Sequence, residues 1–263
     1  TNETPPIQTE QTFPVSKHLL RLKGDQLLPT PDIVAMFNEW VAATQSQRYE
    51  EWRSVKLLQA NDLPEQAQQQ LAKWLDQYAE YNLALQLMAL KGEPSWDNIL
   101  SNLREARGLY FQEQDKGLFD DQIALEDFTE KAVNAFSDDN NPLSTLVELE
   151  RQVSALPPGT RPAVDAMLAQ LTKALQQDSS ISDSPEEWNR LVQSTAAATL
   201  ANPSVDLNEA SADFLKRYNA YSEERARMRQ EGATEDQLRV LRETRFAGSE
   251  RLRANTLDKA LDD

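Results

Sequence analysis

Residues 62–92 have the sequence DLPEQAQQQLAKWLDQYAEYNLALQLMALKG, and this stretch decides the fold. Its large apolar residues recur every three or four positions, which is the spacing of one face of an α-helix. Asp62 and Pro64 favour the start of a helix, and Gly92 favours its end. The stretch therefore predicts one long amphipathic helix whose stripe consists of Leu71, Trp74, Leu75, Tyr78, Tyr81, Leu85 and Met88.

Two shorter helices are predicted before this one. Thr30-Pro31-Asp32 supplies a cap, a first-turn proline and an early acid, and the apolar residues up to Val41 keep helical spacing. The next helix runs from about Tyr49 through Trp52. Three helices with short connections predict a small N-terminal domain over residues 18–92.

The middle of the chain, residues 93–205, predicts a different organisation. Ser95 caps a long helix, and shorter helices follow that are divided at Asn141-Pro142, at residues 157–160 and at Ser184-Pro185. Because each apolar stripe is narrow, each helix buries only a modest face. We expect an extended helical domain here.

The last region, residues 206–263, predicts a second small bundle. Its signals are the aromatic residues from Phe214 onward, a turn at Glu231-Gly232, the capping pair Thr234 and Gln237, and a final helix after Ser249. The expected fold class is all-α: two small three-helix domains joined by an extended helical domain, in a clasp-like arrangement.

Composition agrees with a helical fold and limits the chemistry. Only seven of 263 residues are glycine, and straight-chain helix formers dominate. There is no cysteine, which excludes disulfides and thiolate chemistry. The only histidine, His18, is expected to be exposed, and no carboxylate spacing suits a metal and no glycine-rich loop suits phosphate. We expect a protein that is not an enzyme and has no catalytic residue, metal or cofactor.

Charge separates two regions of the chain. The net charge of −16 argues against nucleic acid as a partner. Residues 120–150 carry nine acidic side chains and one lysine, a net of −8, whereas residues 216–253 carry ten basic and seven acidic, a net of +3. These regions fit either opposite fields for a partner or two solvated surfaces. Residues 1–17, rich in Pro, Thr and Gln at the start, are expected to be a linker whose upstream anchor has been removed.

Several blocks resemble the lipase-specific foldases, the steric chaperones of secreted bacterial lipases. The resemblance covers roughly residues 18–260 and is carried by Arg107 to Phe111, Leu118 to Phe128, Leu149 to Pro157 and Arg217 to Ala254. In that family a membrane anchor and a variable linker precede a small three-helix domain, an extended helical domain and a second small domain. The chain clasps its lipase with all three.

The best-known family motif, Arg-x-x-Phe-Asp-Tyr-(Phe/Cys)-Leu-(Ser/Thr)-Ala, is degenerate in this chain. The matching stretch is VAMFNEWVAA, residues 34–43. Phe37, Trp40 and Val41 keep the residue type, whereas Val34, Asn38 and Glu39 replace Arg, Asp and Tyr. The resemblance implies that these six residues bind the partner, together with four from the last region: Arg242, Arg245, Phe246 and Arg251. Phe246 also fits a core anchor.

The resemblance implies a dedicated chaperone that binds one secreted hydrolase in a 1:1 complex. It folds and holds this client in the periplasm for type II secretion, while a missing N-terminal segment anchors it to the inner membrane. The client is expected to be a lipase or, because the motif has lost its charged residues, a hydrolase such as a metalloprotease. The alternative is a helical scaffold or adaptor of a cell-envelope assembly without folding activity.

Overall fold

The structure is a computed structural model that describes residues 10–42, 49–91, 95–138, 141–178, 180–181, 184–201, 209–246, 250–251, 254–255 and 257–258. Its strands are β1 (Glu10–Val15), β2 (His18–Lys23) and β3 (Gln26–Leu27). Its helices are α1 (Pro31–Ala42), α2 (Tyr49–Leu58), α3 (Glu65–Lys91), α4 (Trp96–Tyr110), the 3-10 helix η1 (Glu113–Phe119), α5 (Asp120–Asp138), α6 (Pro142–Val153), α7 (Arg161–Gln177), α8 (Pro185–Leu200), α9 (Glu209–Gln230) and α10 (Glu235–Arg245).

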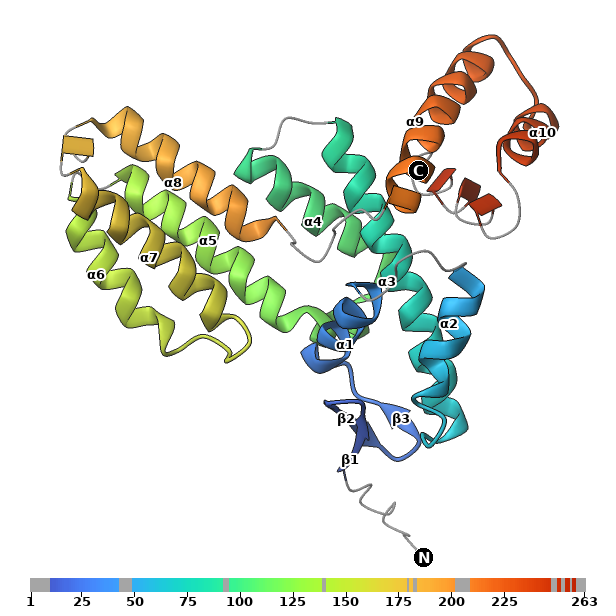
Figure 1. The fold of residues 1–263 in the computed structure, drawn as a ribbon, viewed down its shortest axis with the longest axis horizontal. Coiled ribbons are helices and arrows are strands. Elements are labelled where there is room, and N and C mark those ends of the chain that lie inside the picture. Colours follow the sequence, from blue (N-terminus) through green and yellow to red (C-terminus); the bar gives the residue numbers. More distant parts are fainter. Residues whose placement is uncertain are drawn as a thin grey trace, which may run out of the picture.

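The predicted all-α class is confirmed, with one small sheet added. The long helix expected from residues 62–92 is α3, whose 27 residues span about 40 Å. The molecule is elongated around it: α5 to α8 form one arm, α9 and α10 lie at the other side, and the sheet with α1 and α2 lies beneath (Figure 1). The boundaries proposed near residues 92 and 205 stay predictions.

The linker prediction is wrong for residues 10–17. Residues 10–15 form β1, which pairs antiparallel with β2, and β2 pairs antiparallel with β3. The apolar residues Val15, Leu20, Leu22 and Leu27 point inward and are buried. The sheet therefore belongs to the N-terminal core, because its alternating side chains bury one face against helices.

Helix α3 also completes the short strand β3. The amide of Gln70 donates to the carbonyl oxygen of Leu27 at 3.1 Å, and the amide N–H of Leu27 donates to Gln70 Oε1 at 2.8 Å. One side chain thus satisfies both backbone groups of an edge residue that has no further strand beside it. Residues 1–9 lie outside the described residues.

The buried side chains divide into two main hydrophobic cores. The first contains the sheet, α1 to α3, η1 and the C-terminal aromatic residues, and it runs from Val15 to Phe119 and again from Phe214 to Leu257. The second lies within α5 to α8, between Phe128 and Ala196. The N- and C-terminal regions thus share one core, although some ninety residues separate them in the sequence.

Helix α4 connects the two cores. It packs on α3 at one side and on α8 at the other. Leu100 and Leu103 of α4 meet Leu200 at the end of α8 in a small cluster. Ser95 caps α4 as expected, with its hydroxyl accepting from the N–H of Asn98 at 3.4 Å. The arm formed by α5 to α8 is therefore joined to the long helix through a packed contact.

Candidate functional site

The structure places Phe37 and Trp40 inside the N-terminal core. Phe37 is fully buried, and its ring centroid lies 5.8 Å from that of Trp40 and 5.5 Å from that of Tyr78. The indole N–H of Trp52 donates to the carbonyl oxygen of Trp40 at 3.1 Å. Helix α1 packs against β2, α3 and η1 together, which encloses both rings. The prediction that these two residues bind a partner is not tested by this and stays a prediction. Alanine at either position would open a cavity in the core.

The polar residues of α1 are engaged within the chain. Glu39 Oε1 lies 2.6 Å from Lys17 Nζ, and Glu39 Oε2 lies 3.1 Å from His18 Nε2. The hydrogen bonds from Lys17 and then from His18 lower the pKa of Glu39. His18 is not the exposed residue expected from the sequence, since its side chain is only 10% exposed. The turn between β1 and β2 is thus held on α1 by the Lys17–Glu39 ion pair and the His18–Glu39 contact.

The remaining α1 residues of the predicted site have mixed environments. Asn38 is half-buried and accepts a hydrogen bond from the hydroxyl of Tyr78. Val34 is partly buried against the first core. Val41 lies in α1, but its side chain is outside what the structure describes. Of the predicted α1 site, Glu39 alone among the described side chains is well exposed.

Two blocks that carry the resemblance meet at the junction of α4 and α5. Arg107 donates from both terminal nitrogens to Glu126, at 2.7 and 2.8 Å, and Glu126 is buried. Phe111 and Phe119 lie 4.7 Å apart edge to face, and the guanidinium of Arg107 lies 5.8 Å from the centroid of Phe119. The sequence reasoning missed this ion pair, because Arg107 and Glu126 are 19 positions apart. The pair joins α4 to α5, the first helix of the arm.

Tyr81 lies at the same junction, and its ionisation should make the free energy of unfolding depend on pH in the alkaline range. Burial raises its pKa from 10.0 to about 12. Below pH 10 the phenol is neutral in both states, and above pH 10 the unfolded chain loses the proton first. The free energy of unfolding should therefore fall by about 1.4 kcal/mol per pH unit for this group between pH 10 and 12. Urea titrations at several pH values would measure the slope.

The Tyr81→Phe variant is the matched control for this pH dependence. It keeps the ring but has no proton to lose, so its slope should be shallower than that of the unchanged chain by about 1.4 kcal/mol per pH unit. It also loses the hydrogen bond from Gln122, whose Nε2 lies 3.0 Å from the phenol oxygen. Equal slopes for the two proteins would contradict the buried position of this hydroxyl.

In the C-terminal region, Arg242 belongs to a buried cluster of hydrogen bonds around Asp258. Its Nε donates to Oδ2 of the buried Asp258 at 2.7 Å, and the hydroxyls of Tyr218 and Tyr221 donate to the same carboxylate at 3.0 and 2.5 Å. Arg225 Nε lies 3.5 Å from Asp258 Oδ2. Burial and the adjacent carboxylate raise the pKa values of both tyrosines. This cluster joins α9, α10 and the residues that follow them.

Phe246 is a core anchor, as one of its two interpretations required. Its ring packs on those of Phe214, Tyr218 and Tyr221, and it is buried. Arg245 is exposed and donates to Glu224 at 2.6 Å, and Arg251 is also exposed. Of the four C-terminal site residues, these two arginines are on the surface. Whether they touch a partner stays a prediction.

The structure also reveals apolar surface that the helical stripes did not predict. Seven large apolar side chains are strongly exposed in the described part of the chain: Leu19, Val55, Leu58, Leu109, Leu143, Val147 and Val240. Leu19 lies on the exposed face of β2, and the other six lie off the buried stripe of their helices. That position was the only signal available. A water-exposed apolar side chain is available to a partner without rearrangement of the core.

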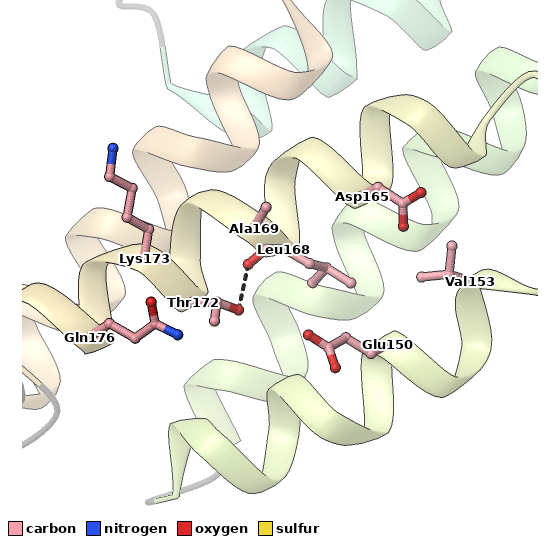
Figure 2. A pocket seen from close by; sticks show the side chains of 8 residues that line it. All are labelled: Glu150, Val153, Asp165, Leu168, Ala169, Thr172, Lys173 and Gln176. Atoms are coloured by element: carbon pink, nitrogen blue, oxygen red, sulfur yellow. Dashed lines mark hydrogen bonds between the residues drawn. The ribbon is translucent and has the colours of Figure 1, made fainter.

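A hollow of about 370 Å³ lies between α6 and α7. Figure 2 shows its lining: Glu150 and Val153 from α6, and Asp165, Leu168, Ala169, Thr172, Lys173 and Gln176 from α7. Among the described residues, no group of three or more metal-binding side chains occurs. The same residues include no helix that is both long and apolar enough to span a membrane.

The structure is that of an elongated helical protein with exposed apolar side chains on its surface and ion pairs in its interior. A family model described as proteobacterial lipase chaperone protein matches residues 74–251, from the middle of α3 to the residues after α10. The match covers more than half of the chain, and the chain belongs to this family of lipase chaperones. The motif-like stretch of α1 lies outside the matched residues. Comparison with curated proteins and with solved structures gave no match.

Proposed function

We propose that this chain is a steric chaperone dedicated to one secreted hydrolase, which it binds in a 1:1 complex, folds and holds for export. The observation that carries the proposal is the family match over residues 74–251. Those residues include α4, the arm formed by α5 to α8, and α9 with α10. The matched residues thus form an elongated helical structure with a large surface, which suits a protein that covers much of its partner.

A chaperone of this kind works without a chemical energy source. It lowers the folding barrier by binding the folding transition state or the near-native client more tightly than the unfolded chain. A rigid surface is needed for this, because a flexible one would adapt to all three states equally. The buried ion pair at the α4–α5 junction and the Asp258 cluster supply such rigidity where the arm begins and in the C-terminal region.

The place of action follows from the same proposal. The chaperone works in the periplasm, is anchored to the inner membrane through an N-terminal segment, and passes its client to type II secretion. The resemblance to the foldases supports these points, and the absence of cysteine is compatible with an oxidising compartment.

A lipase is the client class that the family supports best. The α1 stretch differs from the foldase motif at its three polar positions, which carry Val34, Asn38 and Glu39. The valine has no charge for a client carboxylate, and the other two residues bind Tyr78, Lys17 and His18 of the chain itself. This difference favours a client that does not use the ordinary motif contact, and a non-lipase hydrolase such as a metalloprotease is the second candidate.

Co-expression tests the proposal directly. The full chain would be produced together with the secreted lipase or other hydrolase encoded beside it, and the hydrolase would be assayed for solubility, protease resistance and activity. We expect the two chains to co-purify in equal amounts, and the hydrolase to become active only when the chaperone is present. The hydrolase produced alone is the control.

Two results would contradict the chaperone proposal. Co-purification with a hydrolase that is equally active without the chain would indicate the alternative, a helical scaffold or adaptor of an envelope assembly. Failure of the two chains to bind would also contradict the proposal. A denatured hydrolase diluted into buffer with the purified chain gives the same answer without the cell, because folding is then the only step measured.

A further inference from the structure

The hollow between α6 and α7 has an apolar floor. Leu168 is 2% exposed and Val153 9%, and both line the hollow beside the exposed methyl group of Ala169. The hydroxyl of Thr172 donates to the carbonyl oxygen of Leu168 at 2.9 Å, which is the dashed line in Figure 2. Because this hydroxyl already has a hydrogen-bond acceptor within α7, a bound partner need not supply a polar group at this point of the floor.

Apolar surface continues from the hollow along α6. Leu143 is 63% exposed and Val147 48%, and they precede Glu150 at positions that place all three on one side of the helix. These two exposed aliphatic side chains do not line the hollow, but they add apolar surface on the side of α6 that carries Glu150. We call this apolar surface and the hollow the α6–α7 groove.

The charged residues of the groove lie at its two ends. Glu150 and Asp165 stand near the connection between α6 and α7, whereas Lys173 stands about two turns further along α7, near Gln176. In the described part of the chain, none of the three forms an ion pair. Because the two carboxylates lie at one end of the apolar floor and the ammonium group at the other, the groove would favour one orientation of a bound partner.

We propose that the α6–α7 groove binds an amphipathic helix of the client hydrolase, with the helix N-terminus over Glu150 and Asp165 and its C-terminus beside Lys173. The lining of α7 from Asp165 to Gln176 extends about 17 Å, which matches about three turns of a helix. The positive end of the helix dipole meets the two carboxylates, and the negative end meets the ammonium group. A basic side chain in the first turn of the client helix would strengthen this orientation.

The mode of binding follows from the shape. A channel between two packed helices accepts a third helix, whose apolar face fills the floor and whose polar face remains in water. This inference rests on the proposed function, because it takes the client as the occupant. The other conceivable occupant is a second copy of this chain, and a cross-link from within the groove separates the two.

A site-specific cross-link tests the occupant. The chain has no cysteine, so Ala169→Cys places a single thiol in the groove, and Ala166→Cys places one outside it on the same helix. Both alanines are exposed, so both variants should fold. Each would be labelled with a benzophenone maleimide, bound to the refolding lipase and irradiated, and the cross-linked peptide would be identified by mass spectrometry.

We expect the A169C variant to cross-link one helical client segment with an apolar face and a basic residue in its first turn. The A166C variant should cross-link that segment at least tenfold less. Equal yields from the two variants, cross-links to a loop or strand of the client, or cross-links to a second copy of this chain would each overturn the proposal.

A binding measurement tests the direction of the groove. The Leu143→Ser/Val147→Ser double variant and the charge-inverted Glu150→Lys/Asp165→Lys/Lys173→Glu variant should each bind the lipase at least tenfold more weakly. The effect of charge inversion should be larger at low salt than at high salt. The Val55→Ser/Leu58→Ser double variant of α2 is the matched control, since those side chains are as exposed but lie outside the groove.

The outcomes separate this inference from the proposed function. If the unchanged chain neither binds nor activates the lipase or other hydrolase encoded beside it, the proposed function fails. If it does both and the groove variants bind as well as the α2 control, the function stands and the groove proposal fails. Circular dichroism of each variant, with helicity equal to that of the unchanged chain, shows that loss of binding comes from the surface.

Discussion

Replacing Trp74 with alanine should lower the free energy of unfolding by about 3–5 kcal/mol, the range for a large buried aromatic side chain. Trp74 is 2% exposed in the first core, and its indole N–H donates to Oδ1 of the buried Asp115 at 3.0 Å. The substitution removes the ring from α3 and also leaves a carboxylate of η1 without that donor. Urea unfolding followed by circular dichroism measures the loss.

The Trp74→Phe variant separates these two causes. It keeps most of the ring volume but cannot donate to Asp115, so we expect a smaller loss than for alanine, on the order of 1–3 kcal/mol. If Trp74→Ala lost less than about 1 kcal/mol, the position of this side chain between α3 and η1 would be wrong.

Replacing Arg107 with alanine should have an effect of similar size. The substitution leaves Glu126, whose side chain is 1% exposed, as a buried charge without its bidentate partner. Removing one member of a buried ion pair costs about 3–5 kcal/mol, since the remaining charge has lost its compensation. Because this pair joins α4 to α5, we expect the arm to loosen first. Hydrogen exchange of α5 to α8 would show that loosening.

Two variants define the cause of this loss. Arg104→Ala removes a neighbouring arginine that is 42% exposed, bonds to the surface residue Glu130 and lies 3.8 Å from Glu126, so it should cost much less than Arg107→Ala, about 1 kcal/mol. The double variant Arg107→Met/Glu126→Leu replaces both charges by apolar groups and should lose much less than Arg107→Ala. A double variant as unstable as the single one would show that the guanidinium stabilises through packing on Phe119 alone.

The sheet shows why local signals were insufficient near the N-terminus. The segment from His18 to Leu27 alternates inward and outward side chains and contains a two-residue turn that begins at Gly24, whose φ is 62°. Those are strand signals, but six-residue strands are short and Pro14 lies within β1. What orders the segment is its burial against α1 and α3, which no window of ten residues contains.

The predicted site shows a similar division. The sequence placed Phe37 and Trp40 on the correct helix at the correct spacing. Which face of a short helix is buried, however, depends on the elements that pack against it. In this chain β2, α3 and η1 together cover α1 and enclose both rings. The groove between α6 and α7 could not be predicted either, because α6 and α7 contribute side chains that meet only after the two helices pack.

By itself, the sequence determined the helices, their order and most of their ends, because caps, prolines and apolar spacing act within a few residues. It also determined the family, through blocks that lie mainly between residues 107 and 254. Only the tertiary structure decided which charged side chains form ion pairs within the molecule, as Arg107, Arg242 and Glu39 do. It also decided which apolar side chains remain exposed to water, as Leu143 and Val147 do. Burial and charge pairing depend on distances between segments far apart in the chain, and those distances exist only once the helices have packed.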